Sequence, residues 1–418
     1  MIFRGIVLFL MLISVWNSGF GQGPPRQLDL RECLNRASSQ HPLIAAAQAR
    51  MQGAEEFRKY VGVKPNPTVT VQTENWRVRQ QPPLSLGRDL DIFVYGTQRM
   101  ETGGKATRRR ELADQQVIAA DTEVEVVRLQ LRRDVTRGYW TALQAQTLSE
   151  ITIENRQDLD QLVQTIALRV REGFAPESEL IRARLERQTL IGQELAAAQS
   201  LERAKLDLLK AMGETSFNTD FRLALPGQTG APLLTAGSER LSSEALVKRP
   251  ELMLLRARVE TERANLRLQQ ASAKPDFEIS AGYKRTGGFN TMIGYFTIPL
   301  PLFNRNLAEI GRAAAKLVSA EHELRAEENY VRAEIEAAYR AAKGLQERIQ
   351  EMERDFLKPA DESRKIALIA YREGAASLYQ MLESQRARND ARLLYFRTRH
   401  EFQQALMELD LLIGRELE

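Results

Sequence analysis

The tripeptide Arg-Glu-Gly occurs twice in the 418-residue chain, and this repetition limits the possible folds more than any other feature. Its glycines, Gly173 and Gly374, lie 201 residues apart, and each interrupts a long, charged, Ala- and Leu-rich pattern typical of helices. Another 40 residues on, Gly213 and Gly414 end that pattern. Because glycine readily adopts the positive φ that ends a helix, we predict a helical hairpin with its tip at each Arg-Glu-Gly. Two copies of one long hairpin indicate a duplicated fold.

Prolines mark a second part of the duplication. Pro42 and Pro250 are 208 residues apart, as are Pro67 and Pro275, and a helical pattern fills each interval. The spacing falls from 208 to 201 before the tips, which indicates seven extra residues in the first half, in the polar loop Gln80–Gly87. We therefore divide the chain into a first repeat over residues 22–215, a connecting segment over 216–241 and a second repeat over 242–418.

Short segments of alternating apolar and polar residues follow the prolines in each half. Phe277, Ile279, Ala281 and Tyr283, for example, alternate with polar or small residues. Such runs are the weak signature of outer-membrane β-strands, and a soluble four-stranded sheet is the alternative. The predicted strands cover residues 67–78, 89–98, 276–285 and 291–300.

The helices that follow the strands are long. Apolar residues recur every seven positions along residues 304–358, a spacing typical of coiled-coil packing. A helix of that length would extend roughly 80 Å at 1.5 Å per residue, and Pro359 would interrupt or kink it. The predicted fold is mainly α with four β-strands, in which each repeat consists of a strand pair and a long helical hairpin.

Residues 1–21 have the features of a secretory signal peptide, with a membrane anchor as the alternative. Arg4 precedes the apolar run Ile6–Trp16, which is too short to span a bilayer, and Gly19 and Gly21 suit a cleavage site. An exported protein would be located in the periplasm, outside the cell or in an outer membrane. Hydrocarbon does not tolerate exposed strand edges, so membrane strands would require several chains: two would supply eight strands, and three would supply twelve, enough to enclose a lumen.

The composition argues against catalysis and against nucleic-acid binding. The three histidines lie in different predicted elements, with His322 and His400 on charged helix faces, and the single cysteine, Cys33, is expected to be buried on a helix. The net charge of +4 comes from many compensating charges, without the basic, aromatic-interleaved patch that binds nucleic acid. We expect no enzyme activity, catalytic residue, metal site, cofactor or nucleic-acid partner. A periplasmic coiled-coil scaffold is the main alternative to a membrane channel.

Six sequence features follow one another along nearly all of the chain after the signal peptide. They are Leu28–Leu34 (LDLRECL), His41-Pro42, Lys64–Pro67 (KPNP), Glu101–Lys105 (ETGGK), Pro299–Asn306 (PLPLFNRN) and the two Arg-Glu-Gly tips. None is specific alone. In this order they resemble the TolC family of outer membrane efflux proteins, nearest to its CzcC-like branch of heavy-metal and cation efflux.

The resemblance implies a homotrimer in the outer membrane that extends into the periplasm. Its 12-stranded β-barrel would lie in the lipid and continue as a 12-helix α-barrel across the periplasm. The hairpin tips would dock a periplasmic adaptor bound to an inner-membrane pump of the resistance-nodulation-division type. The protein would be a passive, gated duct that exports metal cations or drugs.

The resemblance also implies gate residues around the second tip. The family pattern there is a Tyr, a Gly three residues later, an Arg, and two acids that form a constriction. Tyr371, Gly374 and Glu383 match this pattern, whereas Ala376 replaces the Arg and Gln380 replaces the first acid. The family's second, Arg-based latch is therefore absent.

The same comparison with the family pattern places Glu179 opposite Tyr371. It implies that a Tyr371–Glu179 hydrogen bond latches the closed state. Three copies of Glu383 would form an acidic ring that favours cations; a solvated carboxylate on a helix face is the alternative. Residues at the turns are candidates for contact with the adaptor, with packing inside their own protomer as the alternative. They are Gly173, Phe174, Ala175, Gly374, Ala375, Ser377 and Leu378.

Overall fold

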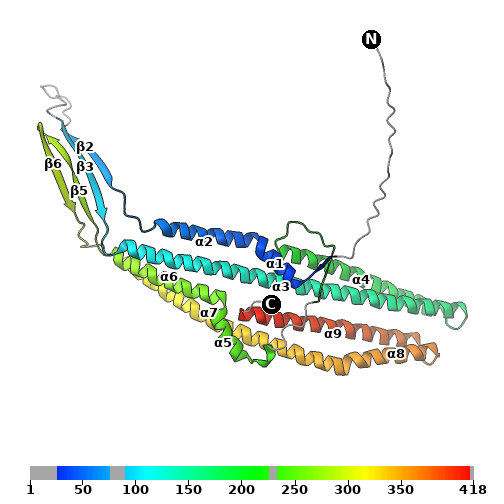
Figure 1. The fold of residues 1–418 in the computed structure, drawn as a ribbon. Coiled ribbons are helices and arrows are strands. Elements are labelled where there is room, and N and C mark those ends of the chain that lie inside the picture. Colours follow the sequence, from blue (N-terminus) through cyan, green and yellow to red (C-terminus); the bar gives the residue numbers. More distant parts are fainter. Residues whose placement is uncertain (1–25, 76–89, 226–232, 415–418) are drawn as a thin grey trace, which may run out of the picture.

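The computed structural model describes residues 26–75, 90–225 and 233–414. The predicted signal peptide, residues 1–21, and the loop Gln80–Gly87 lie outside the described residues. A four-stranded sheet occupies one end of an elongated molecule, and long helices run from it to two turns at the other end (Figure 1). The prediction of a mainly helical fold with few strands is confirmed.

The larger sheet is antiparallel and has the order β2-β3-β5-β6. Its strands are β2 (Thr68–Glu74), β3 (Asp91–Met100), β5 (Phe277–Thr286) and β6 (Phe289–Thr297). The central pair, β3 and β5, joins the two halves of the chain, with Met100 opposite Phe277 and Ile92 opposite Arg285. Within the described residues the outer edges of β2 and β6 have no strand partner.

One face of this sheet carries a row of exposed apolar side chains. Val71, Val94, Tyr283 and Met292 are cross-strand neighbours, one from each strand. Their exposed fractions are 66%, 38%, 40% and 82%. Side chains on a strand alternate between faces, so this row and its apolar neighbours lie together. The sheet therefore presents to its surroundings the kind of face that most proteins bury.

Long helices form the rest of the molecule. The first hairpin consists of α3 (Lys105–Arg171) and α4 (Glu177–Ala211). The second consists of α7 (Leu307–Met352), a π-helical turn η2 (Glu353–Leu357), α8 (Lys358–Arg372) and α9 (Leu378–Ile413). The 67 residues of α3 extend over about 100 Å at 1.5 Å per residue. Pro359 lies in the first turn of α8, directly after the π-helical turn, so the predicted interruption is present.

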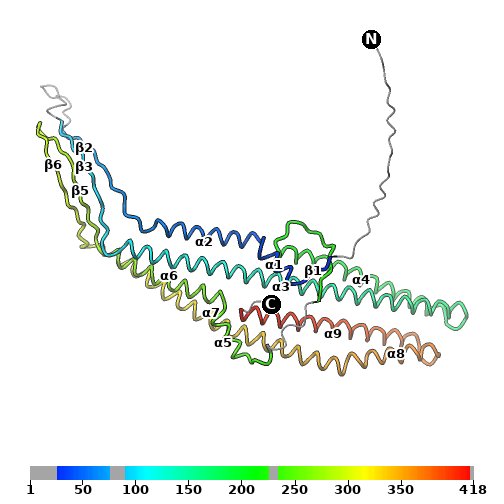
Figure 2. Tube along the Cα trace, in the orientation of Figure 1, coloured from blue at the N-terminus to red at the C-terminus, as the bar shows by residue number. Residues whose placement is uncertain are grey.

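Two shorter helices run beside the hairpin helices in the half of the molecule nearer the sheet (Figure 1). α2 (Pro42–Tyr60) packs along α3, and α6 (Pro250–Ser272) packs along α3 and α7. α2 begins beside the end of α4, where Gly213 lies against His41, and α6 begins beside the end of α9, where Gly414 lies against Lys248. Each half thus contains one joint between a returning helix and a shorter helix (Figure 2).

A small second sheet and two short helices cover the middle of the molecule. β1 (Arg26–Leu28) pairs in parallel with β4 (Phe221–Leu223), beside α1 (Leu30–Gln40). α5 (Ser238–Lys248), preceded by the 3₁₀ turn η1 (Leu233–Thr235), covers α7 and α9. The four predicted strands correspond to β2, β3, β5 and β6, whereas β1 and β4 were not predicted, because strands of three residues are too short to show an alternating pattern.

The middle region contains a compact core. Tyr139 is fully buried and donates its hydroxyl to the carbonyl of Ala224, which follows β4. Cys33 is also fully buried, as predicted, and burial raises the pKa of its thiol to about 12. In the described part of the chain, no helix combines the length and the apolar character needed to cross a membrane.

Candidate functional site at the hairpin tips

The two hairpins pack against each other beside their tips. The helices α3, α4, α8 and α9 contribute buried apolar side chains to one cluster, which we call the tip cluster. Its members are Leu159, Leu162, Ile166, Ala183, Leu190, Tyr371, Leu378, Met381 and Leu382. Both turns lie at the same end of the molecule (Figure 1). Gly173 and Gly374 each have a φ of 78°, which explains why glycine occupies both positions.

Tyr371 connects the two hairpins through its hydroxyl. Its side chain is 3% exposed, and its Oη donates a hydrogen bond of 2.8 Å to Oε2 of Glu179. Burial, followed by the hydrogen bond to the Glu179 carboxylate, raises the pKa of Tyr371 to about 12. The phenol therefore stays protonated at neutral pH and remains a donor. The structure thus brings together the two residues that the resemblance placed opposite each other.

Arg169, near the end of α3, holds Tyr371 from the other side. Its Nη1 donates to the backbone carbonyl of Tyr371 at 2.7 Å, and its guanidinium carbon lies 4.8 Å from the centre of the tyrosine ring. A cation over an aromatic face attracts it electrostatically. Sequence reasoning missed Arg169, because Arg171 shares the last turn of α3 and nothing in the sequence distinguishes the two.

Ion pairs extend the contact between the hairpins away from the tips. Arg388 of α9 contacts Asp158 of α3 at 3.0 Å, and Arg392 contacts Glu154 at 2.9 Å. Arg386 of α9 forms a further pair with Glu186 of α4. Exposed ion pairs are typically worth about 1 kcal/mol or less, but Arg388 and Arg392 are partly buried, at 15% and 20% exposed. The three pairs join α9 to α3 and α4 at points beyond the tip cluster.

The other predicted gate residues lie outside the tip cluster. Glu383 is exposed on α9. Gln380 belongs to the capping box of α9: its backbone N–H donates to Oγ of Ser377 at 3.3 Å, and its Oε1 accepts from the Ser377 N–H at 2.9 Å. Gln380, which replaces an acid of the family pattern, thus helps to cap the N-terminus of α9 in this chain.

The turn residues divide into exposed and buried ones. Phe174 is 73% exposed, and Ala375 is also exposed, although its backbone N–H bonds to the carbonyl of Ala370. Ala175 is half-buried. Leu378 is 3% exposed and packs into the tip cluster of its own chain, which is the alternative considered for the turn residues.

One histidine differs from the sequence expectation. His400 is 8% exposed, lies against the ring of Trp140 and is within 3.1 Å of Oγ1 of Thr147, so it does not occupy a charged, solvated face. Burial and then the charge of Arg399 lower its pKa to about 4, which keeps it neutral. The described residues contain no group of three or more His, Cys, Asp or Glu able to hold a metal ion.

The family model described as outer membrane efflux protein matches residues 241–415. The cobalt-zinc-cadmium resistance protein CzcC of Cupriavidus metallidurans is 23% identical over 398 residues, which cover 93% of this chain and 90% of that protein. The nickel-cobalt-cadmium resistance protein NccC of Alcaligenes xylosoxydans xylosoxydans is 25% identical, with coverage of 80% and 72%. The pyoverdine export outer membrane protein OpmQ of Pseudomonas putida is 24% identical, with coverage of 86% and 80%.

Solved structures show the same fold. CusC superposes with a TM-score of 0.77 at 15% identity, over 96% of each chain. The outer membrane protein VceC of Vibrio cholerae superposes with a TM-score of 0.75 at 18% identity, over 93% of this chain and 97% of that one. The family model and the curated relatives favour a channel over a periplasmic scaffold. Residues 241–415, nearly all of the second repeat, thus match the outer membrane efflux protein family, and the whole chain has the fold of the solved structures.

Proposed function

We propose that this protein is the outer membrane channel of a tripartite efflux system, a passive trimeric duct closed by a gate at its hairpin tips. The observation that carries the proposal is the sheet: its apolar face is exposed over all four strands, and among the described residues its two edges have no strand partner. Such edges are not stable in hydrocarbon. Pairing β6 of one chain with β2 of the next removes every edge when three chains close a 12-stranded barrel.

The helices extend the barrel as a tube. Three chains supply six hairpins, and the end-to-end arrangement of α2 with α4 and of α6 with α9 keeps the wall continuous along α3 and α7–α8. This gives twelve helical positions around the tube, below the twelve strands. The tips then face away from the membrane, where a periplasmic adaptor and an inner-membrane pump of the resistance-nodulation-division type reach them.

We assign divalent metal cations as the exported substrates. Two of the matched relatives are named for resistance to cobalt and cadmium, together with zinc or nickel. OpmQ is named for export of pyoverdine, so related channels also serve organic substrates. A deletion strain should become sensitive to these cations and should keep its tolerance of drugs. Sensitivity to drugs alone would reverse the assignment.

The channel itself is tested with the purified full chain in a mild detergent. We expect a particle with the mass of three chains, and discrete conductance steps after its insertion into planar lipid bilayers. Light scattering coupled to gel filtration measures the mass of the particle, and single-channel recording measures the conductance steps. A water-soluble monomer that never opens a pore would contradict the proposal.

Replacement of Glu383 by Ala is expected to reduce the preference of the pore for cations. In the trimer three exposed Glu383 side chains surround the axis, and a ring of carboxylates attracts cations into the pore. The measurement is the reversal potential in a KCl gradient. Glu351→Ala, which removes an exposed carboxylate near the end of α7, is the control. An unaltered ion preference in Glu383→Ala would place the constriction elsewhere.

Replacement of Ala375 by Asp is expected to weaken binding of the adaptor. Ala375 is exposed at the second tip, and a charge there would have to be desolvated in an apolar contact. Pull-down of the periplasmic adaptor, and metal tolerance of the complemented strain, measure the effect. Ala375→Ser keeps the residue small and should behave as the wild type. Full efflux by Ala375→Asp would show that the adaptor binds another surface.

A further inference from the structure

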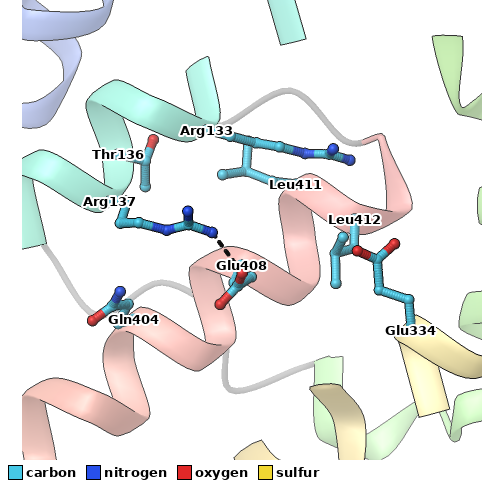
Figure 3. A pocket seen from close by; sticks show the side chains of 8 residues that line it. All are labelled: Arg133, Thr136, Arg137, Glu334, Gln404, Glu408, Leu411 and Leu412. Atoms are coloured by element: carbon cyan, nitrogen blue, oxygen red, sulfur yellow. Dashed lines mark hydrogen bonds and ion pairs between the residues drawn. The ribbon is translucent and has the colours of Figure 1, made fainter. Parts of the chain in front are cut away.

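A cavity of about 90 Å³ lies where α3 passes α9 and α7, near the joint at which α6 begins. Two leucines, Leu411 and Leu412, form part of its wall (Figure 3). The polar residues that line it are Arg133, Thr136 and Arg137 of α3, Gln404 and Glu408 of α9, and Glu334 of α7. The space is large enough for a small ion or a few waters.

Two of these residues have buried polar atoms without a hydrogen-bond partner in the described part of the chain. Nη1 of Arg133 lies 2.9 Å from the carboxylate of Glu251, but its Nε and Nη2 are buried and unpaired. Thr136 is 3% exposed, and its Oγ1 is also unpaired. An unsatisfied buried donor costs about 1–3 kcal/mol, and more when it is charged. Folded proteins rarely keep three such atoms beside one cavity unless something binds them.

The carboxylates around the cavity are already engaged. Glu408 accepts from Arg137 at 3.1 Å, and Glu334 accepts from the buried Arg249 at 2.6 Å. Glu251 is shared between Arg133 and Arg249. Three arginines therefore balance three glutamates, and the groups left over are N–H and hydroxyl groups. The cavity thus offers donors to a ligand, and no free carboxylate to a metal cation.

We propose that this cavity is a binding site for a small oxoanion, a carboxylate or phosphate group, held by Arg133 and Thr136. A guanidinium presents parallel N–H groups that match two oxygens of either anion. Thr136 adds a hydroxyl donor from one turn further along α3. Because the surrounding charges balance, hydrogen bonds rather than net attraction select the ligand, and we expect millimolar affinity.

The site opens away from the core in the middle of the molecule. Arg137 precedes Tyr139 by two residues. At 3.6 residues per turn, this places Arg137 on the opposite side of α3 from the core around Tyr139. Its side chain is 62% exposed. In the proposed trimer three copies of this site would lie around the tube, each between α3 and α9 of its own chain. This placement rests on the proposed function, whereas binding itself does not.

Titration of the full chain in detergent with sodium phosphate or sodium acetate, at constant ionic strength, tests the site by calorimetry. We expect saturable binding, weakened at least about tenfold in Arg133→Met, because a hydrogen bond to a charged group is worth about that factor or more. Arg392→Met is the matched control: it removes a partly buried, ion-paired arginine of α9, 20% exposed against 23% for Arg133. It should bind as the wild type.

Thr136→Val keeps the shape of the side chain and removes only the hydroxyl, so it decides the question if Arg133→Met fails to fold. We expect it to bind several-fold more weakly with an unchanged melting curve. Tighter binding of phosphate than of acetate, or the reverse, identifies the group for which the site is built. Equal affinity in wild type and both variants, or no saturable binding of either anion, would overturn the proposal. These titrations need no pore, so they stand apart from the conductance experiments.

Discussion

Replacing Tyr371 by Phe together with Glu179 by Gln is expected to raise the single-channel conductance several-fold. The double substitution removes the 2.8 Å hydrogen bond that ties the second hairpin to the first at the tips, and it keeps the size of both side chains. A hydrogen bond to a charged group contributes about 1.5–3 kcal/mol. Three such bonds, one in each chain, would hold the closed state, so their loss shifts the population towards the open state. Recording in planar bilayers measures the change.

A second tyrosine provides the control for this experiment. Tyr395 of α9 donates to Glu353 of η2, so this pair has the same chemistry but joins elements of one hairpin. Tyr395→Phe should leave the conductance unchanged. Arg169→Leu, which removes the cation from the ring of Tyr371, should act in the same direction as the double substitution. Wild-type conductance in the Tyr371/Glu179 variant would show that the bond is not a latch.

Asp276→Ala is expected to cost about 3–5 kcal/mol of stability, because it breaks a buried ion pair and leaves one partner behind. The Asp276 carboxylate accepts from Lys105 at 2.6 Å, from Arg99 at 2.8 Å and from the backbone N–H of Thr102 at 3.0 Å. The Lys105 side chain is only 10% exposed, so it would lose its partner away from water. This cluster joins the end of β3 and the start of α3 to the start of β5. Thermal unfolding in detergent measures the loss.

The pH dependence of this junction follows from the same contacts. Burial raises the pKa of Asp276, but the hydrogen bonds from Lys105, the Thr102 N–H and Arg99 outweigh it and lower the pKa below its usual value. A lowered pKa means that the stabilisation is complete at neutral pH and is lost as acid protonates the folded state. Asp355→Ala, which removes an exposed carboxylate paired with Arg354, should change stability by less than about 0.5 kcal/mol. Equal melting of the two variants would disprove the role of the junction.

The overall architecture could be predicted because its signals are long and repeated. A glycine at each tip and a proline before each shorter helix recur at constant spacing, and seven-residue repeats extend over dozens of positions. The second sheet lacked such a signal: β1 and β4 contain three residues each and pair across almost the whole first half of the chain. Their position depends on the core around Tyr139, which only the tertiary structure reveals.

The candidate site was less predictable than the fold. The resemblance identified Tyr371 and Glu179, because both occupy positions of a family pattern. Arg169 has no such pattern, and its contact with Tyr371 exists only because both hairpins end at the same level. Both possibilities stayed open for Leu378 for a related reason: an apolar residue one position inside a turn can face its own chain or a partner, and composition does not distinguish these outcomes.

The two turns have the same φ, and the hairpins that carry them have arms of matching length after the tip. The proposed trimer would therefore end in six nearly equivalent turns, arranged with close to sixfold symmetry even though it has three subunits. A partner built from identical copies can use one kind of contact at all six positions. In the proposed assembly, the two similar tips of each chain would double the number of docking points without adding a subunit.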